Sequence, residues 1–192
     1  MKRKPEGYRG EGHQTIGSDV LSVLNVINFP ENVLGPELAA TLQAAKPGAW
    51  YPIEPLLEAM ERLDRKLGRS GLVQMGRNLF TTSHEARVKQ VAKSAADILY
   101  GIDDMYRHAN RGRDIGGWKV VELKPGRARL LKTTPHHCQM EEGILLQGLQ
   151  SVGVPAMIQQ LRCLRTGSTL CEYEVTSTVT GEKWMGGRPP VG

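Results

Sequence analysis

All three cysteines of the chain lie in its C-terminal third, at positions that a fold can bring together. Cys138 stands where a helix is expected to begin, because Pro135 ends the extended run before it. Cys163 and Cys171 flank turn residues of an expected β-hairpin. Facing residues of an antiparallel pair have Cβ atoms about 4.5–5.5 Å apart, so we expect Cys163 to face Cys171 directly across the ladder. The start of a helix can bring Cys138 to the same place.

Three thiols held together have three chemical interpretations. They can coordinate a metal ion such as Zn²⁺, for which thiolate is a preferred ligand. They can be small buried hydrophobic side chains, which is common for free cysteine. Cys163 and Cys171 can also form a disulfide, but the N-terminus lacks a signal peptide, so we expect a cytoplasmic protein in which thiols stay reduced.

The elements that must position the cysteines follow the order β-β-α-β-β. Alternating or continuous apolar residues predict the strands, and apolar residues at the helical period predict the helix. The expected ranges are strands over 118–123 and 128–132, a helix over 138–152, and strands over 157–164 and 169–175.

Helical patterns dominate the first half of the chain. Amphipathic spacing and stop signals predict helices over 37–45, 53–67, 71–80 and 84–106, the last of them kinked or divided at Gly101. The segment 19–29 is rich in Val and Ile and has no cap, which favours a strand. We therefore predict an α+β fold in which N-terminal helices pack on a C-terminal antiparallel sheet.

One domain accounts for this pattern. We expect a flexible N-terminal tail over residues 1–17, a single ligand-binding-type α+β domain over 18–179, and a flexible C-terminal tail over 180–192. The chain of 192 residues is long enough for one domain with a substantial core.

Composition disfavours two classes of partner. The net charge of +5 is mild and is accompanied by no nucleic-acid-binding motif, so we expect no nucleic-acid partner. No apolar run reaches the roughly 18 residues that a membrane span requires, so no membrane span is expected.

Catalytic patterns are sparse. The sequence has no Gly-x-Ser-x-Gly elbow, phosphate-binding loop, His-Glu-x-x-His motif or dinucleotide fingerprint. A cysteine at a helix N-terminus has its thiolate favoured by the helix dipole, so Cys138 is the only candidate nucleophile, with His136 or His137 as a base. We do not expect an enzyme.

The C-terminal pattern resembles the 4-vinyl reductase domain family. The resemblance rests on Cys138 at a helix start, followed by Gly143 and Gly148, and then on a hairpin with the spacing Cys-x-x-x-Gly-x-x-x-Cys from Cys163 to Cys171. The preceding hairpin, which opens at Trp118, also fits. The resemblance covers residues 117–175 and implies a fold shared with heme nitric-oxide-binding domains and Golgi transport-particle subunits.

The resemblance implies a zinc site. In zinc-binding members three cysteines and one acidic residue hold the metal, and these correspond to Cys138, Cys163, Cys171 and, at the acidic position, Gln160. A neutral amide is a poor zinc ligand. His137 is therefore our candidate for the fourth ligand, with the neighbouring His136 and Glu141 as alternatives.

The resemblance also implies an apolar pocket between the helices and the sheet, with Trp118 at the position of a pocket aromatic residue. Heme is an option because of the related fold, but the Tyr-x-Ser-x-Arg signature of the nitric-oxide sensors is absent. His84 and His108 are the only helical candidates for an axial ligand, and a lone histidine on a surface helix is usually exposed. On this basis heme is not expected.

Two functions compete. The first is a stand-alone sensor module that binds a small hydrophobic ligand and signals through an unknown effector protein. The second is a ligand-free interaction or scaffold subunit whose cysteines are merely buried. A homodimer formed through the long helices fits both. We favour the sensor module.

Overall fold

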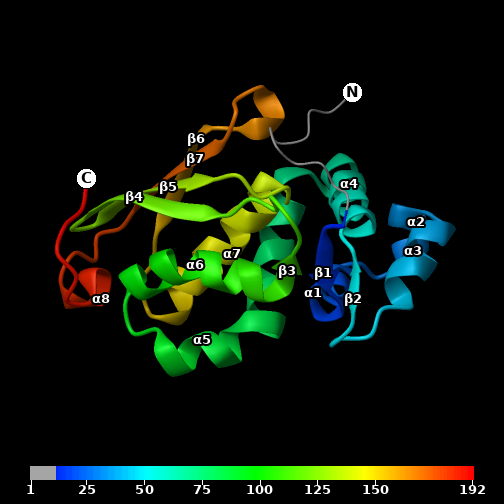
Figure 1. Ribbon diagram of the computed structural model, residues 1–192, viewed down its shortest axis with the longest axis horizontal. Coiled ribbons are helices and arrows are strands. Elements are labelled where there is room, and N and C mark those ends of the chain that lie inside the picture. The colour runs from blue at the N-terminus through cyan, green and yellow to red at the C-terminus, as the bar shows by residue number, and fades with distance from the viewer. Residues whose placement is uncertain (1–11) are drawn as a thin grey trace.

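The structure is a computed structural model and describes residues 12–192 (Figure 1). It contains a helical N-terminal half and a C-terminal half built around an antiparallel sheet. The predicted α+β class is confirmed. Among the described residues, no helix is both long enough and apolar enough to span a bilayer.

The N-terminal half has a small sheet surrounded by helices. Its strands are antiparallel and pair in the order β2-β1-β3, where β3 is the later segment Asn110–Arg111. The helices and strands of this half are β1 (Gln14–Ile16), α1 (Gly17–Leu24), α2 (Pro30–Leu34), α3 (Pro36–Gln43) and β2 (Trp50–Pro52). Proline stands in the first turn of both α2 and α3, where its missing N–H costs nothing.

Three helices and a π-helical turn continue the chain: α4 (Glu54–Leu79), the turn Phe80–His84, α5 (Glu85–Val91) and α6 (Ala95–Ala109), followed by β3 (Asn110–Arg111). Gly68 interrupts α4 with a φ of 61°, at the position where the sequence predicts a helix end. Ser94 and Asp97 form a reciprocal capping box that begins α6.

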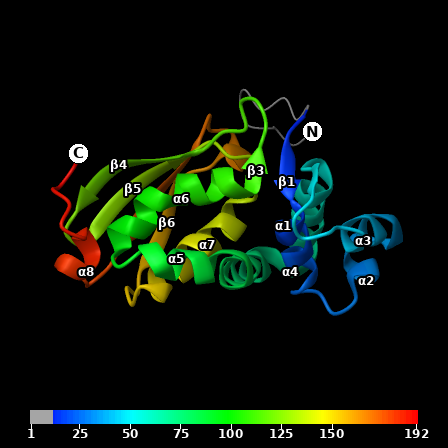
Figure 2. The ribbon, with the colours of Figure 1, turned by 60° about the horizontal axis from the view of Figure 1, so that its bottom comes forward.

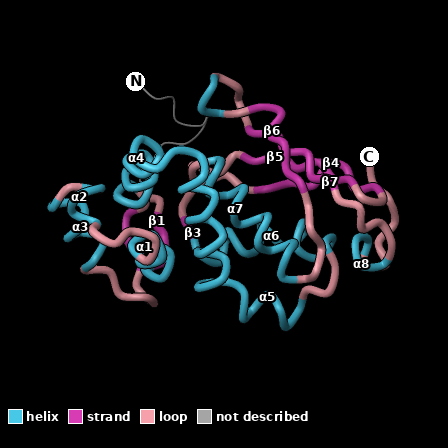
Figure 3. The backbone as a smooth tube through the Cα atoms, turned by 180° about the vertical axis from the view of Figure 1, so that it is seen from behind, coloured by secondary structure: helices cyan, strands magenta, loops and turns pink. Residues whose placement is uncertain are grey.

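The larger sheet has the order β4-β5-β7-β6 and is antiparallel throughout. Its elements are β4 (Trp118–Lys124), β5 (Arg127–Lys132), α7 (Cys138–Ser151), β6 (Met157–Arg162) and β7 (Cys171–Thr176). Figure 2 shows α6 and α7 packed on one face of this sheet, and Figure 3 shows the same arrangement from behind. The predicted β-β-α-β-β order is confirmed.

The two halves meet where α7 crosses α4. Gly143 and Gly76 lie at the crossing, and each glycine Cα faces the backbone of the other helix. A Cβ atom on Gly143 would lie 2.0 Å from the carbonyl oxygen of Val73, and one on Gly76 would lie 1.8 Å from that of Met140. The two helices therefore pack backbone against backbone.

Two predicted elements are wrong. The segment 19–29, expected as a strand, lies largely in helix α1, because its apolar residues Val20 and Val23 are spaced to bury one helical face. The predicted helix over 84–106 is divided at residues 92–94, by the cap of α6, and Gly101 lies inside α6.

The terminal segments also differ from expectation. Within 180–192, α8 (Glu182–Met185) buries Trp184 completely, and the indole Nε1 donates a 2.8 Å hydrogen bond to the Lys124 carbonyl oxygen. Val191 pairs with Leu123 at the edge of the sheet. Of the expected tail over 1–17, residues 1–11 lie outside the described part of the chain, whereas β1 and the buried Gly17 belong to the folded domain.

Candidate functional site

The three cysteines meet beneath the sheet. Cys138 begins α7, Cys171 begins β7, and Cys163 follows the last residue of β6. The Sγ atom of Cys138 lies 3.2 Å from that of Cys171 and 3.5 Å from that of Cys163. All three sulfur atoms lie within 4.8 Å of one another, and no disulfide joins them.

A lysine accompanies the sulfur atoms inside the protein. Lys132, at the end of β5, is fully buried. Its Nζ lies 3.8 Å from the Cys138 sulfur, donates a 2.7 Å hydrogen bond to the His136 carbonyl oxygen and forms an ion pair with Glu141. Thr134 donates a 2.7 Å hydrogen bond to the other oxygen of that carboxylate. The ammonium group thus has three partners inside the protein.

This arrangement favours one thiolate. The hydrogen bond from Cys171, with help from the Lys132 charge, outweighs burial and holds the pKa of Cys138 far below that of a free thiol. The same hydrogen bond, together with burial, raises the pKa of Cys171. Burial acts to lower the pKa of Lys132, but the negative charges of Glu141 and of the Cys138 thiolate overcome this effect, and the pKa is raised. The lysine is therefore a cation that stabilises the Cys138 thiolate.

The predicted fourth ligand points elsewhere. His137 caps α7, where its Nδ1 accepts a 3.4 Å hydrogen bond from the Gln139 backbone N–H. Its Nε2 lies 3.3 Å from a carboxylate oxygen of Asp64 on α4. Gln160, at the family's acidic position, lies close enough to help lower the Cys138 pKa. The structure thus brings the three cysteines together and turns the His137 ring toward α4.

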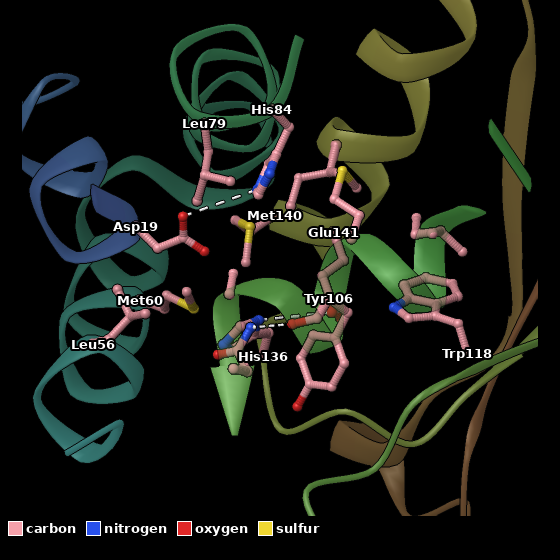
Figure 4. Close-up of a pocket in the computed structure, with 15 residues that line it drawn as sticks. Asp19, Leu56, Met60, Leu79, His84, Tyr106, Trp118, His136, Met140 and Glu141 are labelled. Atoms are coloured by element: carbon pink, nitrogen blue, oxygen red, sulfur yellow. Dashed lines mark hydrogen bonds and ion pairs between the residues drawn. The ribbon is translucent and has the colours of Figure 1, made fainter. Parts of the chain in front are cut away.

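A second site lies between the two halves (Figure 4). Five elements, α1, α4, α6, β4 and α7, together with the π-helical turn and the segments around Asn110 and His136, enclose an apolar pocket with a cavity of about 30 Å³. Trp118, the predicted pocket residue, does line this cavity. Its ring packs on Tyr173 at a centroid distance of 5.5 Å.

Two titratable side chains face each other in this pocket. Figure 4 shows the Asp19 carboxylate and the His84 ring pointing toward one another. Their Oδ1 and Nε2 atoms are 3.9 Å apart, too far for a hydrogen bond. Burial raises the pKa of Asp19 to about 7, and burial, with the nearby charges of His108 and Arg87, lowers that of His84 to about 4. The pair is therefore uncharged near pH 6.

Opposite pH dependences follow from this pair. The folded-state pKa of Asp19, about 7, exceeds its usual 3.8, so its contribution to stability is complete below pH 4 and is lost as the pH rises through 7. The folded-state pKa of His84, about 4, lies below its usual 6.5, so its contribution is complete above pH 6.5 and is lost as the pH falls through 4. The two effects oppose each other in the natural protein.

We expect single substitutions to separate these effects. In the His84→Gln variant only Asp19 titrates, so the free energy of unfolding should fall by up to about 4 kcal/mol between pH 4 and pH 7. In the Asp19→Asn variant only His84 titrates, so the free energy of unfolding should rise by up to about 3 kcal/mol over the same range. Urea denaturation at intervals of half a pH unit measures both slopes. Identical pH profiles for the two variants would contradict the assignment.

Sequence reasoning missed several of these residues. Lys132 had a detectable signal, because it occupies the inward position of β5 together with Ala128 and Leu130. His84, expected to be exposed, is buried, because the π-helical turn directs it inward. Asp19 has no such signal, because the Val- and Ile-rich pattern around it favours a strand.

Comparison with known proteins identifies the fold. No protein-family model and no curated protein matches the sequence. An H-NOX protein from S. oneidensis in the Fe(II) ligation state is similar in structure, with a TM-score of 0.66, 15% identity, and coverage of 87% of this chain and 98% of that one. An Fe(II) unliganded H-NOX protein from K. algicida is similar with a TM-score of 0.63 and 12% identity, and the match covers 86% of this chain and 98% of that one. A structure that concerns the modulation of heme redox potential through porphyrin distortion has a TM-score of 0.60 and 9% identity, with coverage of 85% of this chain and 93% of that one.

These similarities correct the expectation about heme. Proteins with this fold are described with ligated iron and with heme, so the absence of one sequence signature does not exclude the cofactor. The donor chemistry of the pocket also suits a heme iron, because the Nε2 atom of His136 is buried there without a hydrogen-bond partner. The cavity of about 30 Å³ would have to widen to admit a porphyrin.

Proposed function

We propose that this protein is a sensor module that binds a small molecule in the pocket between its two halves and holds zinc at the cysteine cluster. The observation that carries the proposal is the position of the pocket. Its lining residues come from both halves of the fold, including α1 and α4 on one side and β4 and α7 on the other. A ligand there would contact elements of both halves at once and bias their arrangement.

The cysteine cluster supports the zinc part of the proposal. Zinc–sulfur bonds of about 2.3 Å place the sulfur atoms of a tetrahedral site about 3.8 Å apart. The two shortest sulfur–sulfur distances, 3.2 and 3.5 Å, need only a small expansion to accept the ion. Because the His137 ring faces Asp64, we expect water or another exogenous ligand in the fourth position.

Heme is a further candidate for the pocket. If heme is the ligand, His136 or His84 would supply the axial imidazole, and the iron would provide a centre that binds a small molecule such as nitric oxide. The buried, neutral state of both rings supports this role, since burial lowers the pKa of His136 to about 3 and that of His84 to about 4.

The remaining parts of the function are also proposals. A separate effector protein that receives the signal is part of the proposal. A homodimer through the long helices and membership of the 4-vinyl reductase domain family are consistent with the fold, which that family shares.

Elemental analysis of protein purified without added metal tests the zinc site. We expect about one zinc per chain, with loss of the metal in Cys163→Ser and retention in the control Ser168→Ala, which changes a neighbouring residue of the same loop. His137→Gln should retain the metal, because the ring faces α4. A metal-free natural protein that takes up no zinc on titration would contradict the site and leave three buried thiols.

The visible absorption spectrum of the same sample tests heme. A Soret band that shifts in His136→Gln would identify heme and its ligand. A spectrum without a band, before and after incubation with hemin, would remove heme and leave the pocket to a smaller ligand. If the pocket binds no small molecule of any kind, the scaffold function replaces the sensor function.

A further inference from the structure

Three side chains of the described pocket lining each have a buried polar atom without a hydrogen-bond partner. Asp19, Asn110 and His136 all line the cavity and are each more than nine-tenths buried. Among the described residues, Asp19 Oδ1, Asn110 Oδ1 and His136 Nε2 have no hydrogen-bond partner. Two of these three atoms are oxygen atoms: the amide oxygen can only accept hydrogen bonds, and so can the carboxylate oxygen once Asp19 is ionised, above about pH 7.

The orientation of the Asn110 side chain is set by its neighbour. Its Nδ2 donates a 3.0 Å hydrogen bond to the Tyr106 carbonyl oxygen, an atom that can only accept. The amide oxygen is therefore the atom left without a partner. An unsatisfied buried acceptor destabilises the folded protein, so two of them in one cavity indicate a missing donor.

The other carboxylate in the lining, Glu141, is already paired with Lys132 and Thr134, and most of the remaining lining is apolar. Around these oxygen atoms lie side chains that offer contact area and no hydrogen bonds, namely Leu56, Met60, Ile102, Met105, Met140 and Ile144. A ligand that satisfies this lining needs donors at one end and a short apolar chain at the other.

A groove on the outside offers room for that chain. It runs between α5 and α6 and holds a volume of about 170 Å³. His84, Ile102 and Met105 line both the groove and the inner cavity. The two spaces are therefore separated by the same three side chains, and a ligand whose charged end reaches Asp19 would have to pass His84 to extend into the groove.

We propose that the pocket binds a protonated primary amine with a short apolar chain, and that Asp19 and Asn110 hold its ammonium group. An ammonium group carries three donors and no acceptor, which matches the lining. Its charge would compensate the carboxylate of Asp19, whose pKa is raised by burial in the free protein. This inference rests on the proposed small-molecule function and names its ligand class.

Methyl NMR on protein labelled at methionine tests the proposal at pH 8, where Asp19 is mostly ionised. The probe is n-butylammonium chloride, with n-butanol as the uncharged analogue and potassium chloride for the inorganic cation. We expect butylammonium to shift the methyl signals of Met60, Met105 and Met140 with saturation. Met157, which is 77% exposed on the edge strand β6, is the internal control and should not move.

Asp19→Asn keeps the shape of the side chain and removes its charge. Losing a charged hydrogen-bond partner should weaken butylammonium binding by about 10- to 100-fold. The same variant should unfold at a higher urea concentration than the natural protein at pH 8, because a buried charge has been removed. A purely structural role for Asp19 would instead give lower stability. Asn110→Ala, which should weaken binding at the second acceptor, supplies an independent variant.

The outcomes separate this inference from the function on which it rests. If butanol binds as tightly as butylammonium, or Asp19→Asn leaves binding unchanged, the amine assignment is wrong and the pocket remains a small-molecule site. If potassium alone produces the shifts and prevents those of butylammonium, the site holds an inorganic cation and the assignment is again wrong. If no probe shifts the pocket methionines, the inference fails, and with hemin also unbound the proposed function fails too.

Discussion

Gly143→Ala should lower the free energy of unfolding by about 3 kcal/mol, the upper part of the usual range for overpacking. The added Cβ would lie 2.0 Å from the Val73 carbonyl oxygen and 3.0 Å from the Arg77 amide nitrogen. Both neighbours are backbone atoms of α4, which cannot rotate away as a side chain can. The helices must therefore separate, and the pocket that they enclose must change with them.

Gly76→Ala should cost a similar amount, because its Cβ would meet the α7 backbone at 1.8 Å from the Met140 carbonyl oxygen. Gly101→Ala is the matched control. Gly101 lies inside α6 with no atom within 4 Å of an added Cβ, so alanine should stabilise the protein by about 0.5–1 kcal/mol.

Urea denaturation followed by far-ultraviolet circular dichroism measures all three variants. The contrast between Gly143 and Gly101 is the informative quantity, since both changes add the same methyl group to a helix. A Gly143→Ala protein as stable as the natural one would mean that α4 and α7 do not pack backbone against backbone.

Lys132→Met should cost about 3–5 kcal/mol, the range for breaking a buried ion pair by removing one partner. The methionine fills most of the space, so the loss is electrostatic. The substitution leaves Glu141 without its counter-charge, and water cannot replace that charge because the carboxylate is only 3% exposed. It also removes the cation that favours the Cys138 thiolate.

A double substitution identifies the cause. Glu141→Gln keeps an oxygen that can accept the Thr134 hydrogen bond and removes the negative charge. Lys132→Met combined with Glu141→Gln should therefore cost less than the sum of the two single substitutions, by about 1–3 kcal/mol. Lys119→Met is the control, because Lys119 is exposed on β4 and its replacement should change stability by no more than about 0.5 kcal/mol.

These free energies of unfolding should be measured on metal-free protein, so that zinc bound at Cys138 does not mask the differences between the variants. Additive costs would indicate that Lys132 and Glu141 do not interact. A Lys132→Met protein as stable as the Lys119→Met control would indicate that water reaches the pair.

The sequence alone determined the C-terminal half well. Strand alternation, turn residues and helical periodicity are local properties, so the order β-β-α-β-β could be predicted. The meeting of Cys138, Cys163 and Cys171 could also be predicted, because a hairpin brings two of them near one another and a helix start brings the third. The exact pairing differs from the prediction, since the β6–β7 ladder ends at Arg162 and Glu172 and Cys163 lies just beyond it. The fold class followed from the same patterns.

Tertiary structure decided the rest. Asp19 and Asn110 are far apart in the sequence, and neither carries a local signal for a shared cavity. His84 faces inward only because a π-helical turn directs it there, and Lys132 keeps its charge only because Glu141 meets it from another element. A pocket between two halves depends on how those halves pack. Packing is set by long-range contacts such as the Gly76–Gly143 crossing, which no local pattern encodes.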